Sequence, residues 1–231
     1  MLKNIIESYV QKTKNPNFKF DDNISSSVLF SFTRDKIFAL IRGFRFFDTK
    51  HFKKKIFLGK SVKIFNKKNI SLGNNVNIGD YVKLYALGKG NLTLKNNVTI
   101  GSFSQIMISM SLDNIGSHIT IGNNVGIGEF SHIGGAGGVT IGDDVIVGQY
   151  LSLHPENHNY KDPDILIREQ GVSRKGINIG QNCWIGSKVT ILDGVTIGSG
   201  CVIAAGSVVT KSFPNNVIIG GVPAKVIKDR C

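Results

Sequence analysis

Cysteine, proline, methionine and tryptophan are scarce in this chain of 231 residues, which has three Cys, five Pro, three Met and one Trp. The cysteines are Cys183, Cys201 and Cys231, and their positions form neither a disulfide framework nor a zinc-ligand spacing. The sequence therefore predicts free thiols and no bound metal.

Long apolar runs are missing as well. The most apolar N-terminal stretch, residues 37–47, is interrupted by two arginines and a glycine, so it does not predict a transmembrane helix. Residues 1–11 include Glu7 and have no continuous apolar region, which argues against a secretory signal. These absences predict a cytoplasmic protein.

Acidic residues are few at the N-terminal end. Residues 1–69 hold 16 Lys and Arg against 5 Asp and Glu, while residues 70–231 hold 12 against 11, so almost all of the net charge of +12 lies in the first segment. A possible helix over 34–47 gathers apolar residues on one side: Ile37, Phe38, Leu40, Ile41, Phe44 and Phe47.

Two interpretations of this basic segment are open. The helix lies on an anionic membrane surface at the inner face of the membrane, or it packs its apolar side on the adjoining part of the fold or on another subunit. Nucleic acid is not expected as a partner because no recognised motif accompanies the charge.

Glycine is abundant, with 27 residues, and it recurs in a six-residue pattern. An aliphatic residue is followed by Gly, two polar residues and a small apolar residue, as in residues 141–146 and again in 147–152. Six is not a helical period, and Gly after an inward aliphatic residue marks a turn. Three such units make a triangular coil of eighteen residues, and stacked coils bury a continuous core.

This pattern predicts a mainly β architecture with two parts: a basic, partly helical segment over 1–63 and a β-helix over 64–231. Cys183 and Cys201, eighteen residues apart, then occupy the same inward slot of consecutive coils. Short insertions at 88–91, 110–118 and 137–138 leave whole units intact on either side, so we expect loops at corners of the coils.

One long insertion, residues 157–176, departs from the repeat. It is mostly polar and charged, and long loops in compact repeats usually carry function. His158 lies at its start and the single tryptophan, Trp184, follows its end.

These residues carry a family resemblance. The repeated Ile-Gly units, the Asn-His-Asn-Tyr stretch from Asn157, the return through Ile-Gly-Gln-Asn-Cys-Trp-Ile-Gly-Ser from Ile179, and the ending 204–211 through 220–225 resemble the hexapeptide-repeat acyltransferases. The match is closest to sugar and polysaccharide O-acetyltransferases related to the galactoside and maltose acetyltransferases, and it covers roughly 64–228.

The resemblance implies an all-β, left-handed parallel β-helix that assembles as a homotrimer, with acetyl-CoA as co-substrate in a cleft between adjacent subunits. It implies acyl transfer to a sugar hydroxyl, with a histidine at the root of the long loop as general base. Two histidines are candidates. Counting the hexads from Leu153 places His158 at the sixth place, where the galactoside enzymes have their base, and His154 at the second.

A neutral imidazole, with an ordinary pKa near ~6.5, can accept the hydroxyl proton near neutral pH. Glu156 or a backbone carbonyl is a candidate to orient the ring. The resemblance further implies that Trp184 and Ser187 flank the pantetheine arm of the coenzyme. The small residues Ala205, Gly206 and Ser207 are expected to line the path of this arm. Lys211 and Lys225 are expected to bind the phosphates of the coenzyme.

The N-terminal segment does not resemble the small helical domain of the maltose-type enzymes, so the acceptor is left open. It can be a nucleotide-linked sugar, a lipid-linked saccharide or a free glycoside, and a basic segment suits a lipid-linked one. The rival functions are N-acetylation of an amino sugar, a γ-carbonic-anhydrase-like zinc enzyme using His132, His154 and His158, and a non-catalytic β-helix.

Overall fold

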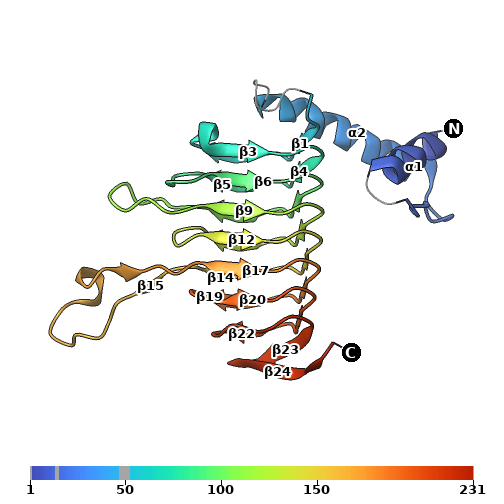
Figure 1. The fold of residues 1–231 in the computed structure, drawn as a ribbon. Helices are drawn as coiled ribbons and strands as arrows, with labels where there is room; N and C mark the ends of the chain where they lie inside the picture. The colour runs from blue at the N-terminus through green and yellow to red at the C-terminus, as the bar shows by residue number, and fades with distance from the viewer. Residues whose placement is uncertain (1, 14–15, 47–52, 231) are drawn as a thin grey trace.

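The computed structural model describes residues 2–13, 16–46 and 53–230. Within them, parallel strands stack into a β-helix with three flat faces, which we name A, B and C (Figure 1). Successive strands of the chain pass from A to B to C and then rise to the next coil. This architecture confirms the mostly β fold with parallel strands that the hexad pattern predicts.

The strands of each face have the following bounds. Face A holds β1 (Ile56–Leu58), β4 (Val76–Ile78), β7 (Thr99–Ile100), β10 (Gly126–Ile127), β13 (Ile146–Val147), β18 (Trp184–Ile185), β21 (Val202–Ile203), β23 (Val217–Gly221) and the antiparallel β24 (Ala224–Asp229). Face B holds β2 (Lys63–Phe65), β5 (Lys83–Tyr85), β8 (Gln105–Met107), β11 (His132–Gly134), β14 (Ser152–His154), β19 (Thr190–Leu192) and β22 (Val208–Val209). Face C holds β3 (Ile70–Leu72), β6 (Leu92–Leu94), β9 (Ile119–Ile121), β12 (Val139–Ile141), β17 (Ile177–Ile179) and β20 (Thr196–Ile197).

The aliphatic residues of the hexads form the core. Ile121, Ile141 and Ile179 are in register on face C, and each is almost completely buried. Because every coil repeats the inward aliphatic positions, the core is a set of aliphatic columns parallel to the helix axis, and each column gains hydrophobic stabilisation from its neighbours. Cys183 and Cys201 are both buried in adjacent coils, which confirms their predicted inward slot.

Asparagine and aspartate turn the chain between faces C and A. Asn75, Asn97, Asn124 and Asp144 have φ of 56 to 59°, the left-handed region that Asn and Asp tolerate better than most residues. Each amide also donates to the side chain of the next coil at 2.9 Å. The same side chains therefore make the turn and tie successive coils together.

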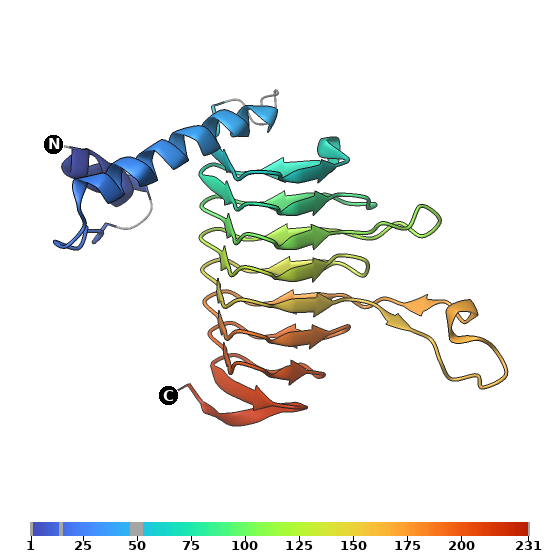
Figure 2. The same ribbon diagram turned by 180° about the vertical axis from the view of Figure 1, so that it is seen from behind.

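The insertions all lie at the corner between faces B and C, which we name the B–C corner. The predicted loops at 88–91, 110–118 and 137–138 each connect a face B strand to a face C strand, and so does the long loop. The longer ones project from one side of the β-helix (Figures 1 and 2). The prediction that insertions fall at corners is confirmed, with one corner taking all of them.

The N-terminal segment is helical, with α1 (Leu2–Thr13), α2 (Ser26–Gly43) and a 3-10 turn η1 (Phe44–Phe46). The Ser25 side chain caps α2 by accepting from the Val28 N–H, so the helix begins before the predicted Arg34; Phe47 lies outside the described residues. Strand β1 already pairs with β4, so coiling begins at Ile56, before the boundary predicted at 64.

Helix α2 lies across the end of the β-helix and contacts β1 (Figure 2). Gly43 permits this contact, since a Cβ there would lie 1.9 Å from the Ile56 carbonyl oxygen. The helix buries Leu29, Ala39 and Gly43 rather than the predicted apolar side. Ile37, Phe38, Leu40, Ile41 and Phe44 are all exposed, so the expectation that they pack on the first coil is wrong within this chain.

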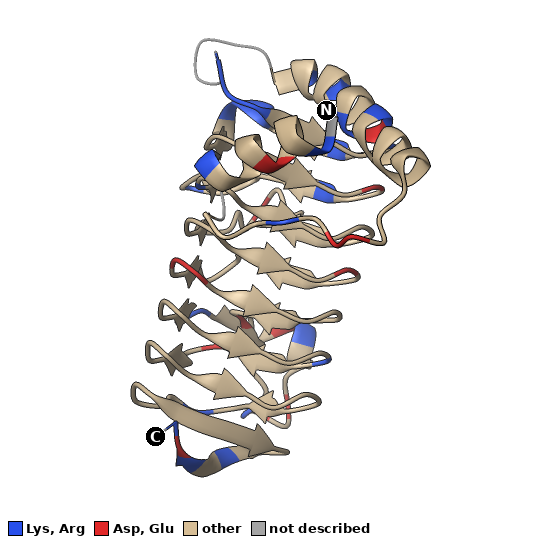
Figure 3. Cartoon of the chain, turned by 90° about the vertical axis from the view of Figure 1, so that its right-hand side faces the viewer, with Lys and Arg blue, Asp and Glu red and all other residues tan. Residues whose placement is uncertain are grey.

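Lys and Arg gather on the helices and on the first coils, at the N-terminal end of the molecule (Figure 3). Among the residues that the structure describes, no helix combines the length and apolar character needed to cross a membrane.

Candidate functional site

The long loop begins as a short two-stranded ribbon. After β14 the chain continues into β15 (Asn157–His158), which pairs antiparallel with β16 (Val172–Ser173) on the return path. A 3-10 turn, η3 (Ile167–Glu169), lies near the tip. His158 pairs with Val172 in this ribbon and its side chain is exposed. The root of the loop is therefore regular and holds His158 in a defined place.

A cavity of about 550 Å³ lies beside His158. The long loop forms one wall and the shorter loop at 109–114 forms the other, with His132 of face B between them. The polar side chains that line it include His132, Glu156, His158, Arg168 and Arg174. An exposed imidazole in a cavity with two guanidinium groups is an arrangement that can take a polar, oxygen-rich molecule.

In the described part of the chain, the Glu156 side chain pairs with Arg174 and makes no hydrogen bond to His154 or His158. Its carboxylate accepts a hydrogen bond from Arg174 Nε at 2.5 Å, and the two side chains are 29% and 21% exposed. Arg174 also donates to the side chain of Asn114 at 2.8 Å and to the Ile115 carbonyl at 3.1 Å. Glu156 thus anchors Arg174, which ties the two loops of the cavity together, and its role in orienting a histidine stays a prediction.

The two candidate histidines have different surroundings. His154 Nε2 lies 2.7 Å from the Ser152 hydroxyl oxygen, and its ring centroid lies 5.7 Å from that of His132. Burial, with a smaller effect from the neighbouring His154, lowers the pKa of His132 below its usual value. No hydrogen bond engages the His158 ring in the described part of the chain, so both ring nitrogens of His158 face solvent and cavity.

The loop root is fixed from below by Asp193, which sequence reasoning missed. Its Oδ1 accepts the backbone N–H groups of Lys175 and Gly176, each at 2.8 Å, and its Oδ2 lies 3.5 Å from Asn157 Nδ2. The signal that could have identified Asp193 is its place in the repeat, because it lies one coil after the long loop and at the same B–C corner.

Most of the residues predicted for the acyl donor gather on face A and on the corner between faces A and B, which we name the A–B corner. Trp184 is exposed on face A, Ser187 and Ala205 lie at this corner on adjacent coils, and Lys225 is exposed on β24. Gly206, at φ +73°, lies in open space, because a Cβ there would meet nothing within 4 Å.

Two predicted donor residues lie elsewhere. Ser207 is completely buried, donates to the Ala204 carbonyl at 2.6 Å and accepts from the Gly221 N–H at 3.2 Å, so it supports the turn instead of lining a surface. Lys211 follows β22 at the B–C corner, the corner that carries His158. A B–C corner is opposite face A in a triangular coil, so one chain does not bring His158 and Trp184 together.

The described residues contain no group of three or more His, Cys, Asp or Glu side chains that could hold a metal ion. His132 and His154 are neighbours, and His132 lines the same cavity as His158, which lies on the ribbon.

Comparisons with known proteins agree with this picture. Residues 176–211 match the family model described as bacterial transferase hexapeptide (six repeats). Over 96 residues the chain is 45% identical to galactoside O-acetyltransferase of Escherichia coli, covering 39% of this chain and 44% of that protein. Over 104 residues it is 36% identical to an E. coli protein provisionally named as a lipopolysaccharide biosynthesis O-acetyl transferase, covering 42% and 53%.

Among solved structures, an N-acyltransferase from Bacillus cereus in complex with dTDP and coenzyme A matches with a TM-score of 0.46 and 25% identity, over 75% of this chain and 83% of that one. The chain spans about half of the length of the two E. coli proteins that it matches, 44% of one and 53% of the other. The resemblance to hexapeptide-repeat acetyltransferases that the sequence predicts is confirmed.

Proposed function

We propose that this chain is an acetyl-CoA-dependent O-acetyltransferase that acts on a sugar hydroxyl, with His158 as its general base. The observation that carries the proposal is the placement of His158: an exposed imidazole without an internal partner in the described chain, at the root of the long loop and beside a polar cavity. His154 is the weaker candidate, because the Ser152 hydroxyl already engages its ring.

The chemistry needs one proton acceptor that later returns the proton. His158 takes the proton of the acceptor hydroxyl as that oxygen attacks the thioester carbonyl carbon of acetyl-CoA. The carbon–sulfur bond then breaks, the acetyl group stays on the acceptor oxygen, and the imidazolium of His158 protonates the departing thiolate of coenzyme A. A backbone N–H of a neighbouring coil is the expected donor to the oxyanion. The proposed transfer is direct: burial raises the pKa of the Cys183 thiol and makes this thiol a poor nucleophile for a covalent intermediate.

The proposal requires more than one copy of the chain. His158 and Lys211 lie at the B–C corner, whereas Trp184, Ser187 and Lys225 lie on face A and at the A–B corner. The resemblance implies a homotrimer of left-handed β-helices, and we propose that the B–C corner of one copy lies against the A–B corner of the next in it. Each site would then combine a base from one subunit with a donor cradle from its neighbour.

The acceptor is proposed to be a saccharide of a surface polysaccharide pathway in the cytoplasm. The names of the relatives, a galactoside and a lipopolysaccharide O-acetyltransferase, support the class of acceptor. The B. cereus neighbour is an N-acyltransferase, and N-acetylation of an amino sugar by the same base remains the second candidate.

The N-terminal helices support an acceptor on a lipid carrier. Ile37 and Ile41 of α2 and Phe44, which directly follows it, form an exposed apolar side, between 53% and 63% exposed, in a segment with a strong excess of positive charge. An apolar side flanked by cations suits an anionic membrane surface. Pelleting with vesicles that contain anionic lipid, compared with neutral vesicles, tests this contact; equal recovery in the supernatant in both would exclude it.

Release of free thiol from acetyl-CoA tests the activity, with nucleotide sugars, glycosides and lipid-linked saccharides as acceptors. His158→Ala should lower kcat by about 10²–10⁴-fold, and His154→Ala should lower it far less. Loss of turnover in His154→Ala alone would move the base to His154.

Mixed trimers test the shared site. His158→Ala and Ala205→Trp should each be inactive alone, and co-expression should restore about a quarter of wild-type activity, because a quarter of the interfaces then combine two intact corners. His158→Ala mixed with His158→Asn is the matched control and should restore nothing. Restoration in neither mixture would mean that each chain holds its own complete site.

A further inference from the structure

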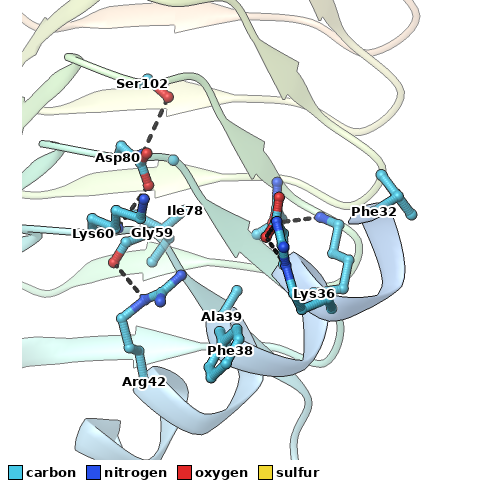
Figure 4. Close-up of a pocket in the computed structure, with 14 residues that line it drawn as sticks. Phe32, Lys36, Phe38, Ala39, Arg42, Gly59, Lys60, Ile78, Asp80 and Ser102 are labelled. Atoms are coloured by element: carbon cyan, nitrogen blue, oxygen red, sulfur yellow. Dashed lines mark hydrogen bonds and ion pairs between the residues drawn. The ribbon is translucent and has the colours of Figure 1, made fainter. Parts of the chain in front are cut away.

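A second cavity, of about 630 Å³, lies between α2 and the first coils, far from His158 along the β-helix (Figure 4). It exists because α2 touches β1 through small residues and leaves the A–B corner uncovered beside it. Phe32 and Phe38 of the helix and Lys60, Asp80 and Ser102 of three successive coils are among the residues that line it. We name it the N-terminal cavity.

Cations outnumber carboxylates in its wall. The cations are Arg34, Lys36, Arg42 and Lys60, and the carboxylates are Asp35 and Asp80. Both carboxylates are engaged, Asp80 Oδ1 by the Lys60 backbone N–H at 2.6 Å and Asp35 Oδ1 by Arg34 at 3.1 Å. The cavity therefore has a surplus of positive charge.

Arg42 is held in position for a ligand. Its Nε donates to the carbonyl oxygens of Leu58 and Gly59 at 2.8 and 3.1 Å, which fixes the plane of the guanidinium. Its two Nη groups make no hydrogen bond within the described part of the chain. A fixed guanidinium with free donors, in a cavity wall that also contains Lys60, is suited to the oxygens of a phosphate or diphosphate.

A row of stacked aromatic rings leads away from this cavity along the A–B corner. It consists of Tyr81, Phe103, Phe130 and Tyr150, one per coil, with successive ring centroids 5.1, 5.0 and 5.1 Å apart and interplanar angles of 4 to 9°. We name it the aromatic ladder.

The ladder joins the two functional ends of the molecule. Tyr81 and Phe103 directly follow Asp80 and Ser102 of the cavity wall. Tyr150 directly follows Gln149, which accepts a hydrogen bond from the Ser187 hydroxyl at 3.0 Å, at the predicted donor site.

Burial and backbone preference do not account for the ladder. The four rings are 44 to 52% exposed, so each leaves about half of its surface in solvent. All four residues have φ of 57 to 62°, a conformation that is costly for bulky side chains, and the corner between faces C and A uses Asn and Asp for the same conformation. The exposed ring edges therefore form an apolar surface whose residues adopt an unfavourable backbone conformation. The C–H faces of sugar rings can pack on such a surface.

We propose that the N-terminal cavity and the aromatic ladder together bind the acceptor, a saccharide joined through phosphate to its carrier. The phosphate lies against Arg42 and Lys60, and the saccharide extends along the ladder toward Gln149. This inference rests on the proposed function. Three coil steps of about 4.8 Å separate the ends of the ladder, so the acceptor is an oligosaccharide rather than a single sugar.

The experiment compares one oligosaccharide in three forms: joined through diphosphate to a short lipid carrier, joined through diphosphate to a nucleoside, and free of phosphate. Lys60→Gln should raise the KM of the phosphate-bearing acceptors roughly tenfold, as expected for one lost charge-assisted contact, and leave that of the phosphate-free one unchanged. A rise limited to the lipid-linked or to the nucleotide-linked acceptor identifies the carrier. Lys228→Gln, an exposed lysine on β24, is the matched control.

The double variant Phe103→Asn, Phe130→Asn removes two rings while keeping residues that tolerate positive φ, so the fold should persist. It should raise the KM of the oligosaccharide acceptors and leave the KM of acetyl-CoA unchanged. Phe65→Asn removes an equally exposed ring from face B and is the control.

Calorimetric binding of the diphosphate-linked oligosaccharide, without acetyl-CoA, separates this inference from the proposed function. Weaker binding by Lys60→Gln and by the double variant supports the inference even if no transfer is detected. Unchanged affinity in both variants overturns it. Dissociation of the oligomer by the double variant, seen by analytical ultracentrifugation, would also overturn it, since the ladder would then be a contact between copies of the chain.

Discussion

Arg174 Nε lies 2.5 Å from Glu156 Oε2, and through this pair the long loop is attached to the loop that carries Asn114. The two loops are insertions two coils apart at the B–C corner, and one guanidinium joins them across the cavity beside His158. The pair therefore links loop geometry to the position of the proposed base.

Replacing Arg174 tests this link. Arg174→Ala removes hydrogen bonds to one carboxylate and to three groups of the other loop, and should lower the free energy of unfolding by about 1–3 kcal/mol while raising the acceptor KM. Denaturant unfolding and steady-state kinetics measure the two effects. Arg168→Ala is the control for stability, because the Arg168 side chain is 81% exposed and its ion pair with Glu169 is 4.0 Å long. A stability loss of the same size in both variants would contradict the assigned role of Arg174.

His132 should make stability depend on pH. Burial, with the charge of His154 as a smaller cause, lowers the pKa of His132 in the folded protein. Between that lowered pKa and the ordinary value near ~6.5, the unfolded chain binds a proton that the folded protein does not, so the free energy of unfolding rises with pH through this window. His132→Gln should flatten the rise, as measured by urea unfolding between pH 5 and 8. An unchanged slope in the variant would exclude His132 as the source.

The Cys183 thiol should be unreactive in the folded protein. It is buried, burial raises its pKa, and its Sγ lies 3.3 Å from the Gly198 carbonyl oxygen. In a Cys231→Ser background, a thiol reagent should label neither remaining cysteine until denaturant is added. Labelling of the native protein within minutes would show that the inward slot opens in solution.

Asn97 should stabilise the turn between faces C and A in two separable ways. It has φ of 59° and its amide joins Asn75 to Asn124 at 2.9 Å on each side. Asn97→Ala loses both advantages and should lower the free energy of unfolding by about 1–3 kcal/mol. Asn97→Gly keeps the backbone freedom and loses only the hydrogen bonds, so it should cost less. Equal losses would mean that the backbone conformation contributes little.

The hexad pattern predicts the coils well because each inward residue is set by its own place in the repeat. The burial of Cys183 and Cys201 follows from their spacing alone. Ser207 was expected to line the donor path because of the family resemblance, but it is buried. It occupies the inward position of its hexad, as Leu151 does two coils earlier, so counting the repeat would have placed it in the core.

Contacts between loops were not predictable in the same way. Arg174 and Asn114 are sixty residues apart and carry no repeat, so only the stacking of coils shows that they meet. The sequence also left open which side of α2 meets the β-helix, because a helical pattern shows which residues share a side and gives no indication of what that side contacts.

The insertions in the described residues all lie at the B–C corner, and this placement affects how the sequence can vary in evolution. A strand of face C keeps its register with the coil below however long the preceding loop is, since the ladder hydrogen bonds form from strand to strand. Residues can therefore be added or deleted at this corner without shifting the coils on either side. The cavity beside His158 can therefore change its shape by exchange of loops alone, while the Asn and Asp side chains between faces C and A hold the coils together.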